Sequence, residues 1–553
     1  MRSVMVLCAA IVMAGMVPAY AATYYVSSSA GNDSAAGTTE AAPWKTFAKA
    51  STVSLVAGDK LLLKCGDTWN EELHPKGNGT AQAPVLISSF GKGAKPIIDR
   101  QDDKADLVGL LLKDQEGFKI VGLEFNKCQT GIYAEYSDNC PTKKYLWIED
   151  CYFHDSLVYG NYKTYPTPRN ISLGVCLFSY ERDKKIILQD IMVKNCVFRR
   201  LASGFWTNSP DNFNAGASFV YNFKNLVFED CLFEEGYQWQ QGIRGVDGGV
   251  MRNCITHDVG RGFRAWNGVA GAMFFRCKDW LIEDCEWGFV DIGQGSGDGE
   301  AFDWEGNCDN SVMKNCTFHD TDGPGFLLCC YASDGNANKD ITMENCVINA
   351  KSKRPIRPNV RAAIINTTDW TTAIWKNCRF YLSPGEALMA VMDGEKDQRS
   401  KFIDCTVKTL AEACKGSPNL ALKARVTASS QDAAAAIDGK PDTAWKPTGD
   451  GSHWLQLALP AATLVNTFKI KEAAGSSISR YQIQYWDDQA KKWMSCFNGM
   501  TIGQEFVCAI ANRTTKGVRL VVMKTTSGSP AVAEFEAYND VAEWKPVPLL
   551  GGR

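Results

Sequence analysis

A cysteine-centred motif recurs through the middle of the chain and limits the possible folds more than any other feature. Each copy runs from an apolar residue to an Asn or Asp that directly precedes a Cys, as in Met192-Val-Lys-Asn-Cys196 and Val227-Phe-Glu-Asp-Cys231. Nine cysteines end such a motif: Cys151, Cys196, Cys231, Cys254, Cys285, Cys316, Cys346, Cys378 and Cys405. The intervals between them are 45, 35, 23, 31, 31, 30, 32 and 27 residues. A unit repeated about every 30 residues, with loops of variable length, is typical of a solenoid.

Within each unit, apolar residues alternate on either side of the Asn or Asp, and no long segment has a helical period. This pattern predicts strand, bend, strand, with a bend residue that tolerates the left-handed conformation. Coils of parallel strands stacked about 4.8 Å apart bring like residues into ladders. The chain therefore predicts an all-β fold, a right-handed parallel β-helix. Neighbouring ladder cysteines would point in parallel, so we expect buried free thiols rather than disulfides.

The N-terminal residues predict export. Arg2 precedes an apolar run, residues 4–17, that is too short to span a bilayer, and Ala19-Tyr20-Ala21 has the small-x-small form of a signal-peptidase site. We expect residues 1–22 to be a cleavable signal peptide and the mature protein to be secreted or periplasmic. With 59 Lys plus Arg against 62 Asp plus Glu, a nucleic-acid partner held by counterion release is not expected. No membrane partner is expected either, and we expect a monomer.

Several N-terminal segments carry a family resemblance. They are Tyr24-Tyr25-Val26, Ala30-Gly31-Asn32-Asp33, Pro43-Trp44-Lys45-Thr46 and Ala57-Gly58-Asp59-Lys60-Leu61. They resemble the opening of exported pectate-lyase-like β-helix enzymes that act on polysaccharides. The resemblance covers residues 23–415 and implies a β-helix catalytic domain. Because this fold hosts lyases, hydrolases, esterases and non-catalytic adhesins, the chemistry has to be argued from a site.

A second module follows the last ladder cysteine. Residues 416–418 resemble a linker, residues 419–540 a module, and residues 541–553 a tail. The module segments Ala436-Ile-Asp438-Gly-Lys440-Pro-Asp-Thr443-Ala-Trp445, His453-Trp454-Leu-Gln456-Leu457 and Ala533-Glu534-Phe-Glu536 resemble the discoidin-like, coagulation-factor type C family. That resemblance implies a β-sandwich (jelly roll), often a carbohydrate-binding module. Trp445, Trp454 and Trp486 fall on positions that resemble core, and the loops at residues 449–452 and 525–530 offer no evident aromatic platform.

The same resemblance implies a structural calcium ion (Ca2+) in the module. Its ligand types fall on Asp438, the Lys440 carbonyl, Thr443 and Glu534, and hard oxygen ligands suit calcium. The alternative is that Asp438 and Thr443 only satisfy a turn.

Carboxylates are most concentrated in Gly297-Asp298-Gly-Glu300-Ala301-Phe302-Asp303-Trp304-Glu305-Gly306. If residues 301–305 form a strand, Phe302 and Trp304 point inward while Asp303 and Glu305 share the outer face, with Cα atoms about 6–7 Å apart. That spacing is compatible with the paired carboxylates of glycoside hydrolysis. Like charges so close should raise one pKa and provide a proton donor. A solvated strand face or a calcium site is the alternative.

Other polar residues recur near this strand. Asp247 and Asp298 are reserve catalytic carboxylates. His257 and His319 follow their ladder cysteines by the same three residues, which predicts equivalent corners about two coils apart. The residues expected to bind substrate are His257, Arg264, Trp266, Arg276, His319 and Asp322.

These features together predict a secreted glycan-degrading enzyme, a glycoside hydrolase in which Asp303 and Glu305 form the central catalytic pair. Two alternatives remain open. One is a polysaccharide lyase, in which calcium or an Arg neutralises a uronate and His257 or Arg264 removes the α-proton. The other is a non-catalytic glycan-binding solenoid.

Overall fold

The computed structural model describes most of the chain. The described ranges are 21–101, 107–156, 171–181, 185–209, 221–260, 268–292, 298–329, 337–353, 361–368, 371–393, 400–440, 442–449, 451–476, 478–526 and 528–547. Most of the expected signal peptide, residues 1–20, lies outside them, as do Arg264 and Trp266. None of the helices in the described part has the length and hydropathy that a bilayer crossing requires.

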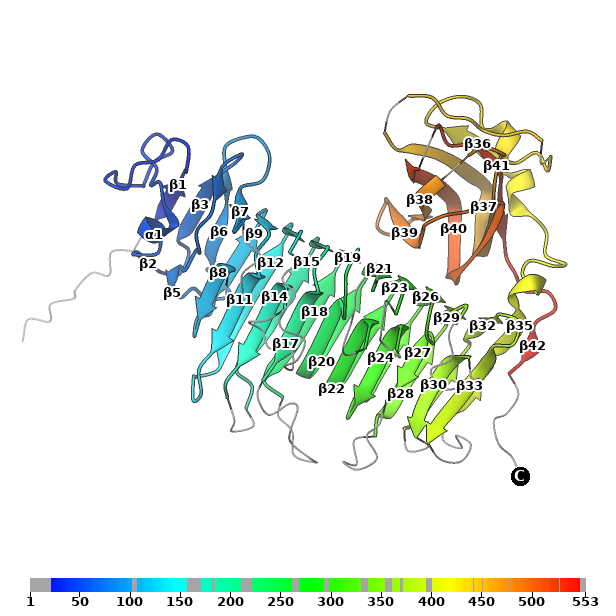
Figure 1. Ribbon diagram of the computed structural model, residues 1–553, viewed down its shortest axis with the longest axis horizontal. Helices are drawn as coiled ribbons and strands as arrows, with labels where there is room; N and C mark the ends of the chain where they lie inside the picture. The colour runs from blue at the N-terminus through cyan, green and yellow to red at the C-terminus, as the bar shows by residue number, and fades with distance from the viewer. Residues whose placement is uncertain are drawn as a thin grey trace, which may run out of the picture.

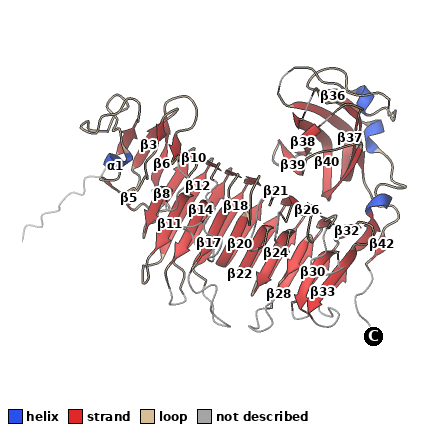
Figure 2. Ribbon diagram, in the orientation of Figure 1, coloured by secondary structure: helices blue, strands red, loops and turns tan. Residues whose placement is uncertain are grey.

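Residues 23–409 form a parallel β-helix with three faces, and nearly all of its regular structure is strand (Figures 1 and 2). One 21-stranded sheet supplies two faces. It contains β1 (Thr23–Val26), β3 (Lys60–Lys64), β6 (Val85–Phe90), β8 (Val108–Lys113), β9 (Phe118–Val121), β11 (Thr130–Tyr136), β12 (Lys143–Glu149), β14 (Leu173–Ser179), β15 (Leu188–Lys194), β17 (Ser203–Asn208), β18 (Phe223–Glu229), β20 (Gln241–Arg252), β22 (Ala270–Glu283), β24 (Glu300–Gly306), β25 (Asp309–Lys314), β27 (Phe326–Leu328), β28 (Lys339–Glu344), β30 (Ala362–Thr368), β31 (Ala373–Lys376), β33 (Ala387–Asp393) and β34 (Lys401–Ile403). The first face holds β24 and its neighbours β27 and β30 together with the first halves of β20 and β22; the second face holds β18, β25 and β28 with their second halves.

A 13-stranded sheet supplies the third face. It contains β4 (Thr68–Trp69), β7 (Ile97–Asp99), β10 (Glu124–Asn126), β13 (Tyr152–His154), β16 (Val197–Arg199), β19 (Leu232–Glu234), β21 (Ile255–Val259), β23 (Glu286–Val290), β26 (Thr317–Thr321), β29 (Val347–Asn349), β32 (Arg379–Leu382), β35 (Thr406–Thr409) and β42 (Lys545–Pro546). The pair β2 (Ser54–Leu55) and β5 (Lys76–Gly77) and the short helix α1 (Phe47–Ala50) lie near the N-terminal end. β42 comes from the expected tail and pairs antiparallel with β35, so the chain returns to the β-helix after the second module.

The repeated motif forms the bend that the sequence predicts. The Asn or Asp before each of the nine ladder cysteines has a φ between 50° and 55°, from Asn195 (50°) to Asp284 (55°). All nine cysteines are buried and free, which confirms the prediction of stacked thiols. Phe153, Phe198 and Phe233 lie two residues after their cysteines, and their rings stack with one another and with Phe125 of the preceding coil, with centroids 4.6–4.9 Å apart. These ladders make the core continuous along the β-helix.

The second module is a β-sandwich with its own core, which includes Trp445. Its strands are β36 (Arg425–Ala428), β37 (His453–Glu472), β38 (Ile478–Asp487), β39 (Lys492–Gly499), β40 (Glu505–Thr525) and β41 (Val532–Tyr538). Trp454 and Trp486 do not join this core; both are half-buried, so their assignment to the core was wrong. The module stands on the C-terminal half of the third face (Figure 1). Lys408 and Tyr381 of the β-helix bind the buried Asp540 at 2.9 and 2.8 Å and help to fix the module there.

Candidate active site

β24 places three acidic side chains on the outside of the first face. Its Ala301, Phe302 and Trp304 belong to the core, as predicted for the last two, whereas Glu300, Asp303 and Glu305 lie outside it. Asp298 precedes the strand, and Gly268 on the neighbouring coil leaves room for it, because a Cβ there would lie 1.6 Å from Asp298 Oδ2. The acidic cluster therefore has four members, Asp298, Glu300, Asp303 and Glu305.

Sequence reasoning missed Glu300 as a member of the acidic cluster. A strict alternation would place Glu300 on the same side as Phe302 and Trp304. Ala301 and Phe302 are consecutive core residues, so the alternation breaks between them and Glu300 turns outward. The sequence feature that could have indicated Glu300 as a site residue was its place within the acid-rich run from Asp298 to Glu305.

Burial and mutual repulsion hold protons on this cluster. Burial raises the pKa of Asp303 well above its usual range, and the charge of Glu305 and a hydrogen bond with it raise that pKa further. Burial, followed by the charge of Asp298, raises the pKa of Glu300 in the same direction. Burial and the charge of Glu305 raise the pKa of Asp298 to about 6. Because Asp303 and Glu300 are 3% and 1% exposed, while Asp298 and Glu305 are only half-buried, the cluster combines hidden acids with accessible ones.

The hydrogen bond between Asp303 and Glu305 changes how the predicted pair can work. Hydrogen-bonded carboxyl oxygens lie about 2.5–3.0 Å apart. Glycosidases separate their two catalytic carboxyl groups by about 5–5.5 Å or about 6.5–9.5 Å. Side chains in this contact are closer than either separation, and the expectation that Asp303 and Glu305 are the two catalytic groups stays a prediction. They can share one proton as a unit, and a second carboxylate would come from Asp298 or Glu300.

Apolar and aromatic side chains border the acidic cluster along the first face. Met273 and Leu327 are the register neighbours of Asp303 on the two adjoining coils. Met273 packs with Trp239, Ala270 and Phe275. Such a border lowers the local dielectric and is consistent with the raised pKa values. Arg276, expected to bind substrate, is buried at the corner of β22, where its guanidinium lies 4.7 Å from the Phe275 ring centroid.

His257 and His319 do occupy equivalent positions two coils apart, since His257 pairs with Gly288 and Gly288 with His319. They lie on the third face, however, and not with the acidic cluster on the first face. His319 is fully buried, and its ring stacks on Phe497 of the module with centroids 4.2 Å apart. His257 Nε2 lies 3.3 Å from the buried Glu234. The structure therefore corrects the expectation that these imidazoles join the carboxylates in one site.

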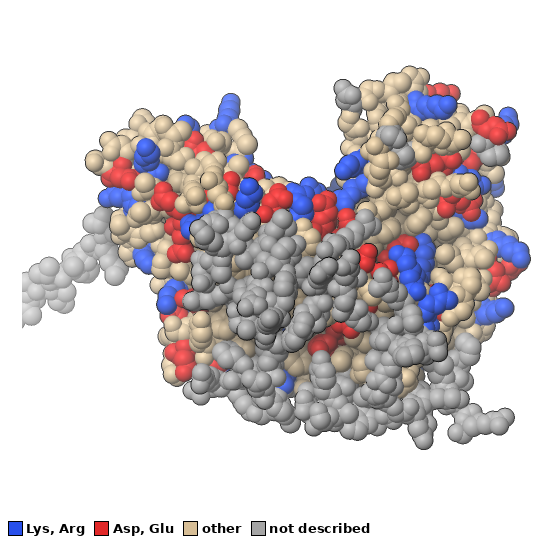
Figure 3. All heavy atoms as spheres, viewed as in Figure 1, with Lys and Arg blue, Asp and Glu red and all other residues tan. Residues whose placement is uncertain are grey.

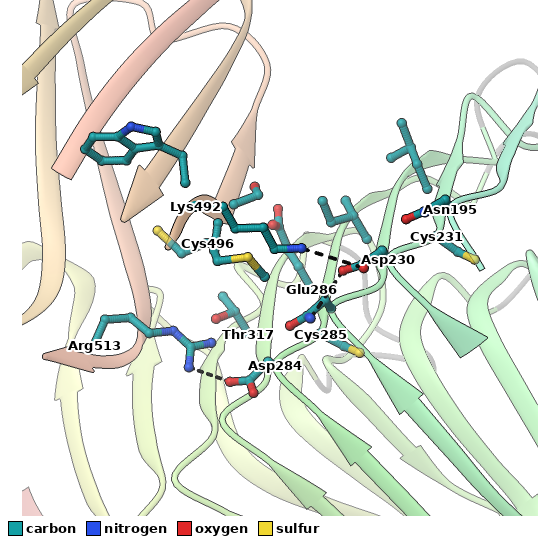
Figure 4. Close-up of a pocket in the computed structure, with 16 residues that line it drawn as sticks. Asn195, Asp230, Cys231, Asp284, Cys285, Glu286, Thr317, Lys492, Cys496 and Arg513 are labelled. Carbon is teal, nitrogen blue, oxygen red and sulfur yellow. Dashed lines mark hydrogen bonds and ion pairs between the residues drawn. The ribbon is translucent and has the colours of Figure 1, made fainter. Parts of the chain in front are cut away.

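The third face and the module meet through ion pairs beside these histidines. Figure 4 shows Arg513 of the module reaching Asp284 at 2.5 Å and Lys492 reaching Asp230 at 3.7 Å. A cavity of 240 Å³ lies between them, lined by residues of both domains.

Basic and acidic side chains are interleaved on the face seen in Figure 3, so neither sign of charge dominates it.

The remaining predicted site residues lie apart. Asp247 is on the second face, ion-paired with Lys278 at 3.3 Å, and so is not part of the acidic cluster. Asp322 follows β26 and pairs with Lys353 at 3.1 Å. The next residue, Gly323, donates to the Gly299 carbonyl at 3.0 Å, so Asp322 lies close to the start of β24.

The predicted calcium ligands gather at one end of the module. Thr443 Oγ1 lies 2.9 Å from Asp438 Oδ1 and 2.9 Å from the Lys440 carbonyl oxygen. Glu534 is 2% exposed, and within the described residues neither of its carboxylate oxygens has a hydrogen-bond partner. Burial and the charges of Glu536 and Asp438 raise the pKa of Glu534. In the described part of the chain no group of three or more His, Cys, Asp or Glu side chains forms a metal cluster, so a cation here would need the Thr443 and Lys440 oxygens as well.

Comparison with known proteins agrees with this architecture. A model of the right-handed β-helix region matches residues 108–278, and a model of the F5/8 type C domain matches residues 425–536. The chain therefore carries an F5/8 type C domain behind a right-handed β-helix. Lacto-N-biosidase of Bifidobacterium longum subsp. longum is 35% identical over 136 residues, which cover 20% of this chain and 8% of that protein.

A solved structure extends the likeness over most of the chain. The GH136 lacto-N-biosidase from Eubacterium ramulus is similar with a TM-score of 0.53 and 19% sequence identity, covering 70% of this chain and 68% of that chain. At this identity the similarity concerns the fold. The F5/8 type C domain and the right-handed β-helix are thus both established, in the order that the sequence predicts.

Proposed function

We propose that the protein is a glycoside hydrolase whose active site is the acidic cluster on β24. The observation that carries the proposal is the gathering of four carboxyl groups on β24 and just before it, where burial and the charges of neighbouring carboxylates raise the pKa values of Asp298, Glu300 and Asp303. Glycoside hydrolysis needs a protonated and an ionised carboxyl group side by side at neutral pH. The fold similarity to a lacto-N-biosidase supports the same class of chemistry.

In this proposal Asp303 is the proton donor. Its burial and its hydrogen bond to Glu305 keep a proton on the pair, ready for the oxygen of the departing sugar. Asp298 is the second carboxylate, because it is partly exposed and, with a pKa of about 6, is largely ionised at pH 7. As the leaving group departs, its negative charge would stabilise the positive charge that develops at the anomeric carbon.

The relatives suggest the first substrate to test. Both are lacto-N-biosidases, so we propose a glycan that ends in a lacto-N-biosyl unit. The experiment is release of the aryl group from an aryl lacto-N-bioside, together with reducing-end release from neutral, uronic and sulfated glycans. Hydrolysis gives reducing ends without the absorbance near 235 nm of an unsaturated uronide. That absorbance would favour the lyase, and no release from any substrate would favour the non-catalytic solenoid.

We also propose that Asp438, Thr443, the Lys440 carbonyl and Glu534 hold a structural calcium ion. The supporting observation is the buried Glu534 carboxylate, whose oxygens have no hydrogen-bond partner among the described residues and which a cation would neutralise. A ligand at 100 times its dissociation constant stabilises the folded state by about 2.7 kcal/mol. Millimolar calcium should therefore raise the Tm of the full chain above its value in chelator. Glu534→Gln should abolish the difference, and an unchanged wild-type Tm would refute the metal site.

A further inference from the structure

Three tryptophans and an arginine lie together on the outer surface of the module's sheet. They come from four strands: Trp454 from β37, Trp486 from β38, Trp493 from β39 and Arg519 from β40. All four are half-buried, and none belongs to the module core. The Arg519 guanidinium lies between two indoles, 4.7 Å from the Trp454 ring centroid and 4.1 Å from that of Trp493. Trp486 meets Trp493 edge to face at 5.6 Å.

A hollow of 320 Å³ opens beside these rings. It is lined by Gln456, Trp486, Trp493, Lys516 and Gly517. Gly517 forms part of its floor because it has no side chain: a Cβ there would lie 3.2 Å from the Trp493 ring and 3.7 Å from Trp486 Cβ. Glycine weakens a strand interior, so its presence in β40 is consistent with a close approach by another group.

The cations around the hollow are Lys516 and Arg519, and Arg519 has no carboxylate partner in the described part of the chain, its guanidinium being covered by two indole rings. Lys516 Nζ lies 3.7 Å from Asp488, which also accepts a hydrogen bond from Trp486 Nε1 at 3.2 Å. Arg519 donates to Gln456 Oε1 at 2.8 Å, so the Gln456 amide nitrogen is held toward the hollow's rim. The Trp493 indole N–H donates to no acceptor in the described part of the chain. The site therefore offers aromatic surface, an amide group and a guanidinium that is covered by aromatic rings.

We propose that this hollow, which we call the sheet-face site, binds a neutral glycan. The C–H face of a pyranose ring would pack on Trp486 or Trp493, and its hydroxyls would bond with the Gln456 amide and the Trp493 N–H. A purely structural Arg–Trp stack accounts for Trp454, Arg519 and one side of Trp493. It leaves unexplained the open hollow at Gly517 and the exposed faces of Trp486 and Trp493. The proposal shares only its ligand class, glycans, with the proposed hydrolase function.

Affinity gel electrophoresis of the full chain tests the sheet-face site. The probes are soluble β-1,4-galactan, mixed-linkage β-glucan and galactomannan, with polygalacturonate as an acidic comparator. Asp303→Asn is the background, so that turnover does not remove the probe. Trp493→Ala deletes an aromatic face, and Gly517→Val fills the hollow while keeping every tryptophan. Thr514→Val is the matched control, since it adds valine to an exposed position of the same strand, β40.

At least one neutral polysaccharide should retard the background protein. Trp493→Ala and Gly517→Val should each weaken that binding about tenfold or more, as expected for a buried aromatic anchor, and Thr514→Val should change it less than about twofold. Binding to polygalacturonate alone, no retardation by any neutral probe, or wild-type binding by Gly517→Val would overturn the proposal. Made in the wild-type background instead, Gly517→Val should turn over a small aryl glycoside at the wild-type rate. Retardation without hydrolase activity would refute the proposed function and leave the sheet-face site standing.

Discussion

Two groups of buried titratable residues on the β-helix differ in the sign of the charges beside them. On the first face, β24 gathers carboxyl groups beside one another, and the pKa of Asp303 and of Asp298 rises. On the third face, β26 carries His319 and Asp320. The carboxylate of Glu286 contacts His319, and the ammonium group of Lys351 contacts Asp320. There burial alone would raise the pKa of Asp320, but Lys351 and His319 outweigh it and lower that pKa to about 2.

The difference indicates what each group is for. On the third face His319 and Asp320 have partners of opposite charge, and Glu286 also accepts two hydrogen bonds from Asn498 of the module, at 2.6 and 2.7 Å. Such pairing fixes one docked arrangement of two domains. Like charges crowded on β24 reduce stability instead, and proteins retain that arrangement where chemistry needs shifted pKa values. The pairing on the third face therefore serves docking, and the first face is where we propose the chemistry.

The largest effect should come from removing the shared proton on β24. Asp303→Asn and Glu305→Gln should each lower turnover by about two to four orders of magnitude, because a proton donor or the residue that holds its proton is lost. The fold should stay intact, since Phe302 and Trp304 supply the packing of β24. Initial rates on the best substrate of the wild type, with circular dichroism of each variant, measure both.

A matched control sharpens this result. Asp279→Asn changes an exposed carboxylate at a φ of 57°, a conformation that Asn tolerates, and should leave turnover unchanged. If Asp303→Asn and Glu305→Gln both kept wild-type rates, the acidic cluster would be structural. The proposed difference in function between the two faces would then be refuted.

The docking face should respond in stability and not in chemistry. Glu286→Gln replaces one acceptor oxygen by an amide that faces the donors of Asn498 and His319, so it should lower the free energy of unfolding by about 2 kcal/mol. Turnover should hardly change. Chemical denaturation of the full chain measures the loss, with Glu283→Gln as the control. Glu283 pairs with Arg252 on the surface, where the loss should stay below about 1 kcal/mol. Equal losses in the two variants would contradict the docking role.

The pH dependence of docking follows from His319. Burial alone would lower the pKa of this imidazole, but Asp320 and Glu286 outweigh it and raise that pKa above 6.5. The folded state therefore holds the proton more tightly than the unfolded state. The resulting stabilisation is complete below about pH 6.5 and is lost as pH rises through the folded pKa. Thermal unfolding between pH 6 and 9 should show this decline in the wild type and not in His319→Gln, and parallel curves would refute it.

The repeat made the β-helix predictable, whereas the site depended on tertiary detail. The Asn or Asp before each ladder cysteine sets a bend that is local in sequence, so the coils could be derived from residues such as Asn195 and Asp230 alone. Glu300 was missed because two consecutive residues, Ala301 and Phe302, both point inward. The repeated His257 and His319 suggested substrate binding, but their common surroundings arise from contact with a module more than 100 residues further along the chain.

The smallest expected effect tests the cost of the acidic cluster itself. Asp298 has a pKa of about 6 in the folded state against about 3.9 in an unfolded chain, so the folded state holds its proton more tightly. Stability is therefore lost as pH rises from about 4 to about 6, because the unfolded chain ionises first, and the loss then stays constant. Asp298→Asn removes this cost and should be more stable than the wild type by about 1–2 kcal/mol at pH 7.5, a value discounted for the exposed part of the side chain. At pH 4 the two proteins should be nearly equal in stability.

Urea unfolding at both pH values measures the difference, and the same variant should lose turnover if Asp298 is the second carboxylate. A variant less stable than the wild type at pH 7.5 would show that Asp298 is held by favourable partners, as on the third face, and would remove the contrast between the two faces at this residue.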